Sequence, residues 1–185
     1  MESRIIIAGS GGQGILFLGK LIAYSGMIEG REVTWFPSYG AEMRGGTANC
    51  TVIVSDEMVG SPVIRNPDIL IAMNEASYNR FSERLLSGGI LIYDSSLINI
   101  KNHRNDIKAI GVPATELSAS LKNTKSANMV MVGALVGLAH ALSINSVIQA
   151  IDEITPARRK DSAGINKDLV MKGYNLFEDK KGKDN

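Results

Sequence analysis

The sequence predicts an α/β fold in which helices cover both faces of a mixed, mostly parallel sheet. Short apolar runs of strand length recur along the chain, and most are followed by longer segments that suit a helix. Residues 69–73 are continuously apolar, which is typical of a strand covered on both faces. The glycine-rich residues 9–14 directly follow the first apolar run, as in the strand-to-helix turns of nucleotide-binding domains. These observations favour a three-layer, Rossmann-like architecture.

The first half of the chain departs from a strict alternation of strand and helix. Residues 14–28 carry Ile15, Leu18 and Ile22 at helical spacing, with small residues between them that allow close packing on a sheet. Residues 47–54 alternate and are rich in β-branched residues, as expected of a half-buried strand with a hairpin partner after it. The predicted strands are 4–8, 32–36, 47–54, 59–63 and 69–73, and the predicted helices are 14–28 and 74–86.

The second half is predicted to contain two more strands and a largely helical C-terminal third. Gly88 and Gly89 end the preceding helix. Residues 126–141 are largely apolar and predict a buried helix, in which Met129 and Met131 serve either as core residues or as an adaptable interface. The predicted strands are 90–93 and 108–113. One predicted helix begins at residue 114, and three further predicted helices span residues 126–141, 146–154 and 166–177.

Length and composition indicate one domain. The 185 residues, 44% of them hydrophobic, suffice for one buried core, which we assign to residues 1–177, while the polar residues 178–185 predict a disordered tail. A formal net charge of +1 without a basic cluster argues against a nucleic-acid partner. The N-terminus lacks the apolar stretch of a signal peptide, and residues 129–139 are too few to cross a bilayer. We therefore expect a cytoplasmic protein without a membrane span.

The glycine-rich segment has the composition of an anion-binding loop. Glycines let the backbone turn sharply and let its amide hydrogens approach a phosphate, and the following helix adds a partial positive charge. The spacing of Gly9, Gly11 and Gly14 satisfies G-x-G-x-x-G, although a tight turn without a ligand has the same pattern. The candidate binding residues of the loop are Gly9, Ser10, Gly11, Gly12, Gln13 and Gly14.

A nicotinamide dinucleotide is disfavoured as the ligand. Such sites place an acidic residue at the carboxyl end of the second strand, about 20 residues after the loop. The second predicted strand runs out into Phe36, Pro37 and Ser38. Glu29 and Glu32 precede or begin this strand, so they are expected at the opposite edge of the sheet.

Further candidate residues are expected at the same edge as the loop. Ser38 and Asn74 each follow a predicted strand there, although Asn74 is also a good N-cap for the next helix. Arg44, in a glycine-rich segment, suits either bidentate binding of a phosphate or carboxylate, or a salt bridge to another subunit. Gln13 is either a ligand of a phosphate or ribose, or a helix cap.

The cysteine and histidine residues predict no metal centre in this chain. Cys50 is the one cysteine, and iron–sulfur clusters take about four thiolates each. Its position in a predicted strand indicates a small buried hydrophobe rather than a nucleophile. His103 is expected in a solvated loop and His140 in a structural position, and neither has a second ligand at a suitable spacing.

Three segments together resemble one family. They are residues 9–14, residues 37–46 (PSYGAEMRGG) and residues 67–74 (PDILIAMN). The likeness is to the gamma subunit, or gamma domain, of the 2-oxoacid:ferredoxin oxidoreductases, especially the 2-oxoglutarate members. Gln13 after paired glycines, with an arginine-glycine-glycine block about thirty residues later, is its most specific part.

The resemblance implies one subunit of a larger enzyme, which oxidatively decarboxylates a 2-oxoacid to its acyl-CoA and reduces ferredoxin. Thiamine diphosphate with Mg would be held by the alpha and beta subunits, and iron–sulfur clusters by beta or a ferredoxin-like subunit. The chain itself would be an inactive scaffold that docks through residues 39–46 and shares in binding coenzyme A, with Ser10, Gln13, Ser38, Arg44 and Asn74 among its contacts. When isolated, it is a candidate homodimer.

Two other interpretations are compatible with the residues. One is a stand-alone nucleotide- or flavin-binding protein, which the missing acid after the second strand and the missing P-loop lysine disfavour. The other is a gamma subunit of a related enzyme that acts on pyruvate, a branched-chain 2-oxoacid or indolepyruvate. The substrate contacts of such complexes are expected mainly on other chains.

Overall fold

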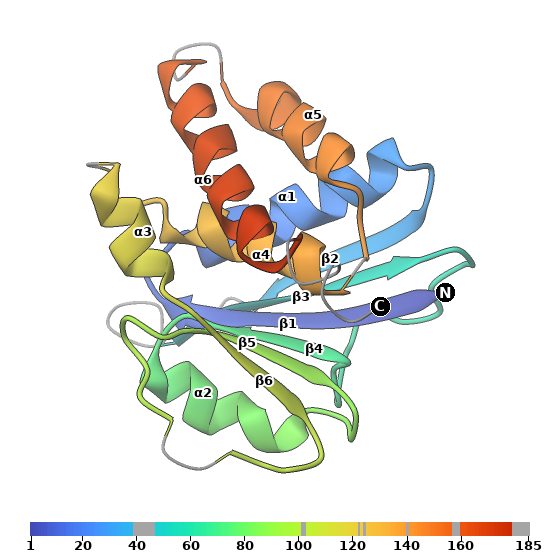
Figure 1. Ribbon diagram of the computed structural model, residues 1–185. Helices are drawn as coiled ribbons and strands as arrows, with labels where there is room; N and C mark the ends of the chain where they lie inside the picture. The colour runs from blue at the N-terminus through green and yellow to red at the C-terminus, as the bar shows by residue number, and fades with distance from the viewer. Residues whose placement is uncertain are drawn as a thin grey trace, which may run out of the picture.

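The computed structural model describes residues 1–38, 47–100, 103–121, 123, 125–139, 141–156 and 160–178. Helices cover both faces of one six-stranded sheet, which confirms the predicted α/β, three-layer architecture (Figure 1). The strands are β1 (Glu2–Ser10), β2 (Glu32–Ser38), β3 (Thr47–Ser55), β4 (Ile69–Ala72), β5 (Ile90–Asp94) and β6 (Lys108–Val112). The helices are α1 (Ile15–Ile28), α2 (Glu75–Phe81), the short 3₁₀ helix η2 (Ser82–Arg84), α3 (Ala114–Ser120), α4 (Ala127–Ala139), α5 (Ile144–Ile154) and α6 (Lys160–Glu178).

The sheet is mixed and mostly parallel, as predicted. Its strand order is β2-β3-β1-β4-β5-β6, and β1, β4, β5 and β6 run parallel. Strand β3 runs antiparallel to both of its neighbours, β1 and β2. Strands β1 and β2 therefore end at the same edge, which is also the edge where the parallel strands β4 to β6 end. Ligands of open α/β sheets bind at this edge.

The predicted strand at 59–63 is wrong. Residues 56–68 form no strand, and Val59 and Ile64 instead pack against the apolar cluster on the α2 side of the sheet. The reason lies in β3, whose two hydrogen-bonding edges are already taken by β1 and β2. A following segment therefore finds no free edge on β3, and it crosses the sheet face on its way to β4.

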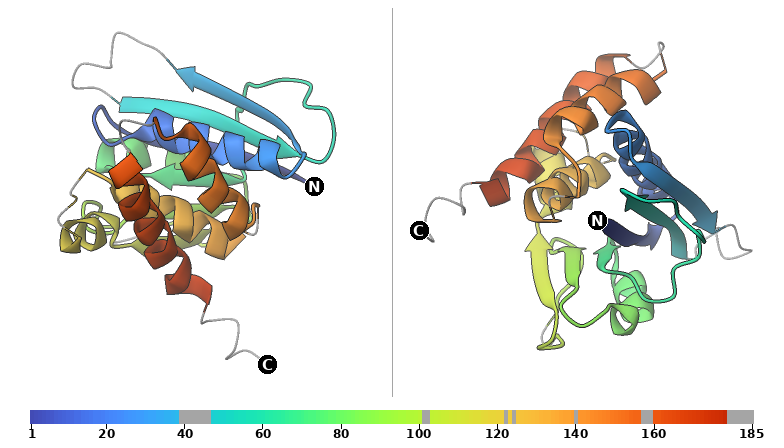
Figure 2. Two further views of the ribbon diagram at one scale, coloured as in Figure 1. Left: turned by 90° about the horizontal axis from the view of Figure 1, so that it is seen from above. Right: turned by 90° about the vertical axis from the view of Figure 1, so that its right-hand side faces the viewer.

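The two faces of the sheet are covered unequally. Helix α2 lies alone on one side, and α1 and the C-terminal helices lie on the other, which the side view makes plain (Figure 2). Helix α4 is buried all round and forms the centre of the larger apolar cluster, which confirms the predicted buried helix. Met129 is 1% exposed and Met131 is fully buried, so both are core residues. None of the described helices combines the length and the apolar character that crossing a bilayer requires.

Several helix bounds differ from the predictions. Helix α2 ends at Phe81 and continues as η2 rather than as an α-helix to residue 86. Helix α6 begins at Lys160, six residues before the predicted start, and it ends at Glu178. The predicted disordered tail, apart from Glu178, lies outside the described residues.

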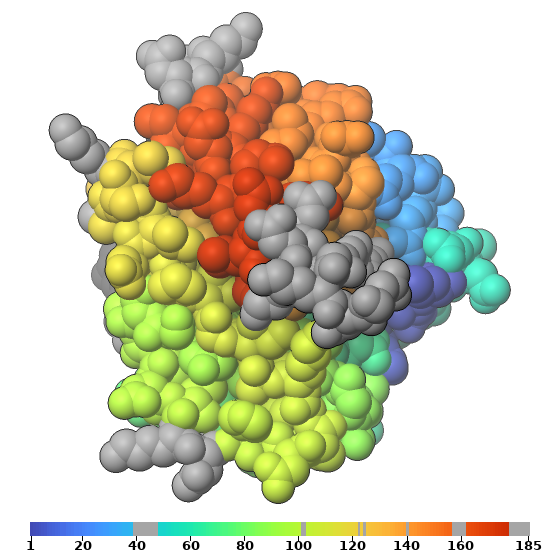
Figure 3. All heavy atoms as spheres, viewed as in Figure 1, coloured from blue at the N-terminus to red at the C-terminus, as the bar shows by residue number. Residues whose placement is uncertain are grey.

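Helices α4 and α6 pack through their backbones, and α6 forms part of the molecular surface (Figure 3). A Cβ atom at Gly133 of α4 would overlap the carbonyl oxygen of Val170, and a Cβ atom at Gly173 of α6 would overlap that of Val130. Glycine at these two positions therefore sets how closely the helices approach.

The close approach predicts opposite effects for two glycine substitutions. Gly133→Ala should lower the free energy of unfolding by about 2 kcal/mol or more, because backbone blocks the new methyl group. Gly164→Ala in α6 is the matched control, since its Cβ would meet open space, and it should add about 0.5–1 kcal/mol through helix propensity. Urea unfolding of both variants gives the comparison, and a Gly133→Ala variant as stable as the parent chain would contradict it.

Candidate functional site

The glycine loop forms the predicted turn from strand to helix. Strand β1 ends at Ser10, and the backbone N–H of Gln13 donates to the Ser10 carbonyl at 3.2 Å, which closes the turn. Gly12 and Gly14 have φ of 95° and 72°, in the left-handed region that favours glycine. Helix α1 begins directly after Gly14, and its first intrahelical bond runs from the N–H of Leu18 to the Gly14 carbonyl at 2.9 Å. The amides of residues 15–17 thus have no partner within the helix.

Gln13 fastens the loop to the sheet. Its Oε1 accepts the backbone N–H of Ser10 at 2.6 Å, and its Nε2 donates to the carbonyl of Met73 at 2.8 Å. Both ends of the side-chain amide are therefore engaged within the chain, across the ends of β1 and β4. The side chain caps no helix in this arrangement, and direct contact with a phosphate stays a prediction.

Asn74 is the N-cap that its position predicted, and it also reaches the loop. Its Oδ1 accepts the N–H of Ser77 at 2.8 Å in the first turn of α2, and its Nδ2 donates to the hydroxyl of Ser10. The hydroxyl hydrogen of Ser10 has no acceptor among the described residues. Ser10 can thus donate to a ligand at the edge of the sheet.

The other predicted site residues divide into two groups. Ser38 ends β2 opposite Asn49 of β3, which in turn lies opposite Ala8 of β1, so Ser38 shares the edge of the loop but lies two strands away. Arg44 lies outside the described residues, as does the whole predicted docking segment 39–46. Their roles in ligand and subunit binding stay predictions.

Glu29 has a structural role at the opposite edge. Its Oε1 accepts the N–H of Ser143 at 2.6 Å and the hydroxyl of Ser146, and it thereby holds the start of α5. The carboxylate is thus far from the loop and already bonded. This placement agrees with the prediction that Glu29 lies at the edge opposite the loop.

A cavity that sequence reasoning missed adjoins the loop. It has a volume of about 640 Å³ and lies where the starts of α1, α4 and α6 converge. Asn128 of α4, 5% exposed, forms part of the wall and donates from Nδ2 to the Gly14 carbonyl at 3.2 Å. The lining residues are Gly14, Phe17, Asn123, Lys125, Ser126, Asn128, Met129, Thr155, Pro156, Ser162 and Asn166. The sequence signal that could have pointed here is an asparagine in the first turn of α4, just before an uninterrupted apolar run.

The electrostatics of the cavity favour an anion. Among the described lining residues, Lys125 is the one cation and none is acidic. The first turns of α1 and α4 also contain no acidic residue, so side chains there do not offset the partial positive charge of either helix start.

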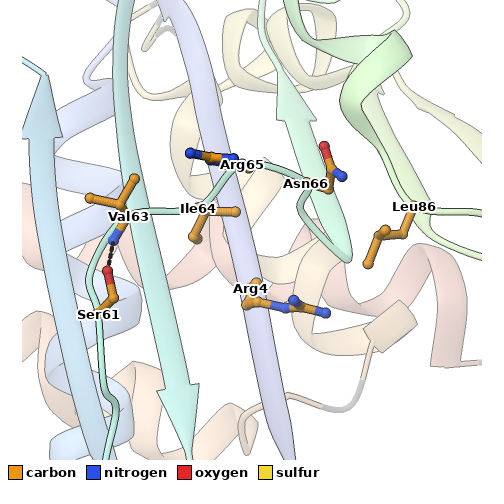
Figure 4. Close-up of a pocket in the computed structure, with 7 residues that line it drawn as sticks. All are labelled: Arg4, Ser61, Val63, Ile64, Arg65, Asn66 and Leu86. Carbon is orange, nitrogen blue, oxygen red and sulfur yellow. Dashed lines mark hydrogen bonds between the residues drawn. The ribbon is translucent and has the colours of Figure 1, made fainter.

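A second hollow, of about 520 Å³, lies at the opposite edge, where β1 and β4 begin (Figure 4). Arg4 on β1 lines it, but its Nε is 2.9 Å from Oδ2 of Asp68 in an ion pair. The guanidinium of Arg84 donates to the carbonyls of Ile64 and Arg65 and so holds the adjoining loop. These contacts support the fold, and we place the candidate site at the glycine loop.

The described residues offer little for metal or thiol chemistry. No group of three or more His, Cys, Asp or Glu side chains among them is arranged to hold a metal ion. Cys50 is fully buried, and burial raises the pKa of its thiol to about 12, so it is the predicted small core residue. His103 is exposed and contacts the carbonyl of Arg104, whereas His140 lies outside the described residues.

The contact between Gly14 and Asn128 yields a test of how the loop is packed. Gly14→Ala should destabilise the protein more than Gly30→Ala, although both residues have φ of 72°. The left-handed conformation costs a side chain about 1–2 kcal/mol at either position, but only at Gly14 would the methyl group also overlap Asn128. Adding Asn128→Ala to the Gly14→Ala variant should remove the additional loss of stability. Thermal unfolding measures the stability of each variant. Equal losses of stability in Gly14→Ala and Gly30→Ala would contradict this account.

Comparison with known proteins places the fold in a family. Residues 4–176 match the family described as pyruvate ferredoxin/flavodoxin oxidoreductase. The ketoisovalerate oxidoreductase subunit VorA of Methanothermobacter thermautotrophicus is 42% identical over 137 residues. The aligned segment covers 74% of this chain but only 28% of the length of that relative. The 2-oxoglutarate synthase subunit KorC of Methanocaldococcus jannaschii is 30% identical over 182 residues, which cover 97% of this chain and 96% of the relative.

A solved structure agrees with the sequence relatives. The 2-oxoglutarate:ferredoxin oxidoreductase of Magnetococcus marinus, with 2-oxoglutarate, coenzyme A and succinyl-CoA bound, is similar at a TM-score of 0.88 and 26% identity. The similarity covers 96% of this chain and 31% of that one. Because the family match extends from β1 into α6, and because it confirms the resemblance carried by the three sequence motifs, the chain belongs to the pyruvate ferredoxin/flavodoxin oxidoreductase family.

Proposed function

We propose that this chain is the gamma subunit of a 2-oxoacid:ferredoxin oxidoreductase and that it supplies part of the binding surface for coenzyme A. The observation that carries the proposal is the glycine loop, which Gln13 and Asn74 attach to the ends of β1 and β4 at the carboxyl edge of the sheet. The similar structure from Magnetococcus marinus is described with coenzyme A bound, which supports this choice of ligand.

The loop suits the pyrophosphate of coenzyme A. The amides of residues 15–17 have no partner within α1, and the helix start adds a partial positive charge. Ser10 has a hydroxyl hydrogen to donate beside them. These groups would bind and orient the coenzyme A chain, and its thiol would be directed toward a reaction centre on the other subunits.

The redox groups are proposed on partner subunits. An iron–sulfur cluster takes about four thiolates, whereas this chain has the single, fully buried Cys50. The residues present therefore do not fit a cluster. Thiamine diphosphate, Mg and the clusters would be held by the alpha, beta and ferredoxin-like subunits, with ferredoxin as the acceptor of the complex.

We propose 2-oxoglutarate as the substrate, because the KorC relative matches almost end to end. The higher identity to VorA, over a shorter segment, favours a branched-chain 2-oxoacid as the second candidate. Assays of the intact complex with 2-oxoglutarate and with 2-ketoisovalerate distinguish them by the ratio of kcat/KM.

Because the redox groups are assigned to partner subunits, we expect the isolated chain to be inactive. Purified alone, it should not reduce ferredoxin or a viologen dye with any 2-oxoacid and coenzyme A, because it fits no electron carrier. The complex that copurifies with a tag on this chain should reduce the dye. Dye reduction by the chain alone, free of other polypeptides, would overturn the assignment.

A charge placed in the loop tests the coenzyme A site. Gly11→Asp in the complex should raise the KM for coenzyme A by about tenfold or more, because a carboxylate then faces the pyrophosphate. The KM for the 2-oxoacid should stay unchanged. Gly60→Asp is the matched control, since Gly60 is exposed, far along the chain and surrounded by open space. An intact Gly11→Asp complex with the parent KM for coenzyme A would refute the proposed site.

A further inference from the structure

The hollow at the edge where β1 and β4 begin is lined by hydrogen-bond donors that the fold only partly uses. We call it the Arg65 hollow, and its volume of about 520 Å³ lies within the usual range for small-molecule sites. Arg4 reaches it from β1, whereas Arg65 and Asn66 reach it from the loop that leads to β4 (Figure 4). None of the described residues that line it is acidic.

The loop that forms one wall of the Arg65 hollow is fixed by the rest of the chain. Ile64 is 5% exposed and packs in the apolar cluster on the α2 side of the sheet. The guanidinium of Arg84 donates to the carbonyls of Arg65 at 2.8 Å and Ile64 at 2.9 Å, and the hydroxyl of Thr51 donates to the carbonyl of Pro62 at 3.1 Å. The wall is therefore formed before a ligand arrives, which lowers the entropy that binding costs.

The side chains around the hollow leave positive charge without a partner. Arg4 donates from Nε and Nη2 to the two carboxylate oxygens of Asp68 at 2.9 and 3.0 Å, and Oε1 of Glu2 lies 3.8 Å from the same Nε. Nη1 of Arg4 has no hydrogen-bond partner among the described residues. Arg65 is exposed, and neither it nor Arg84 forms an ion pair with a described residue. An anion in the hollow would therefore meet unpaired guanidinium groups.

The arrangement of the donors suits a phosphate better than a carboxylate. A guanidinium presents a fork of N–H groups that matches the oxygens of a phosphate and stays charged at any physiological pH. The Ser61 hydroxyl accepts the N–H of Val63 at 3.2 Å and keeps its own hydrogen for a ligand, and the Asn66 amide has no partner among the described residues. Because the donors come from two elements, they can bind oxygens that point in different directions, as in a tetrahedral group.

An apolar surface lies beside these donors. Val63 is 64% exposed and Leu86 is half-buried, and both line the hollow. Covering apolar surface of this kind is favourable, by roughly 25 cal/mol for each Å² removed from water. A ligand that carries an apolar body next to its phosphate would gain from both parts of the wall.

We propose that the Arg65 hollow binds a small organic phosphate, with the phosphate at Arg65, Asn66 and Nη1 of Arg4 and the apolar body on Val63 and Leu86. The hollow lies where β1 begins, and the glycine loop lies where β1 ends. The two sites are thus at opposite edges of the sheet. The inference adds a second anion site, and it does not depend on the role of the glycine loop.

The test uses phenyl phosphate and benzoate, which share a ring and differ in the anionic group. In an NMR titration of the ¹⁵N-labelled full chain, phenyl phosphate should shift the side-chain resonances of Arg65 and Asn66. It should bind more tightly than benzoate, because a phosphate carries more negative charge and a third acceptor oxygen. Benzoate that binds as tightly as phenyl phosphate would overturn the assignment to a phosphate.

A substitution at Arg65 tests the location. Arg65→Gln should weaken phenyl phosphate by about tenfold, because a charge-assisted contact is lost. The fold should be preserved, since the Arg65 side chain is exposed and Arg84 binds only its backbone carbonyl. Lys20→Gln, at an exposed position of α1 outside the hollow, is the matched control and should leave the affinity unchanged. Binding at the glycine loop is common to all these chains, so a difference between them belongs to the hollow.

A second variant tests the apolar wall without changing the charge. Val63→Ala should weaken phenyl phosphate by about threefold and leave inorganic phosphate unchanged, because only the former places a ring on this side chain. Val63 is largely exposed, so the variant should fold as the parent does.

Three outcomes refute the inference. They are an Arg65→Gln chain that binds phenyl phosphate as the parent does, a Val63→Ala chain that does so, and a titration that shifts no side-chain resonance of Arg65 or Asn66. A titration that shifts only resonances of the glycine loop would refute the Arg65 hollow and leave the proposed function standing.

Discussion

The side-chain amide of Gln13 is the contact on which the candidate site depends. It joins the N–H of Ser10, at the end of β1, to the carbonyl of Met73, at the end of β4. Asn74 adds a second bridge between the same two strand ends through the hydroxyl of Ser10. The loop is therefore fixed by the protein itself before a ligand arrives. Such preorganisation reduces the entropy that binding would otherwise cost.

The described residues contain one of the two features that dinucleotide sites of this architecture combine. The turn from strand to helix has the glycine conformations of phosphate-binding loops, whereas β2 ends at Ser38, where a dinucleotide site would place an acid. The nearest candidate acid, Glu29, holds the start of α5 at the far edge. Among the described residues, the structure thus has the glycine turn of such sites without an acid at the end of β2.

Features that depend on neighbouring residues could be predicted from the sequence. The strand before the glycine loop, the N-cap at Asn74 and the buried helix α4 each follow from a local pattern of residue types. The role of Gln13 could not be predicted, because its partner Met73 lies 60 residues away. The cavity was missed for the same reason, since Gly14, Lys125 and Thr155 meet only in the folded chain. The false strand at 59–63 came from a local pattern that carries no information about which strand edges are free.

The backbone contact between α4 and α6 has a consequence for the width of the cavity. Helix α4 supplies Asn128 and Met129 to one wall, and α6 supplies Ser162 and Asn166 to another. Because the helices touch at Gly133 and Gly173 without side chains between them, no change of rotamer can alter their spacing there. The gap between these walls is therefore set by the main chain, and the two helices should move as one rigid unit.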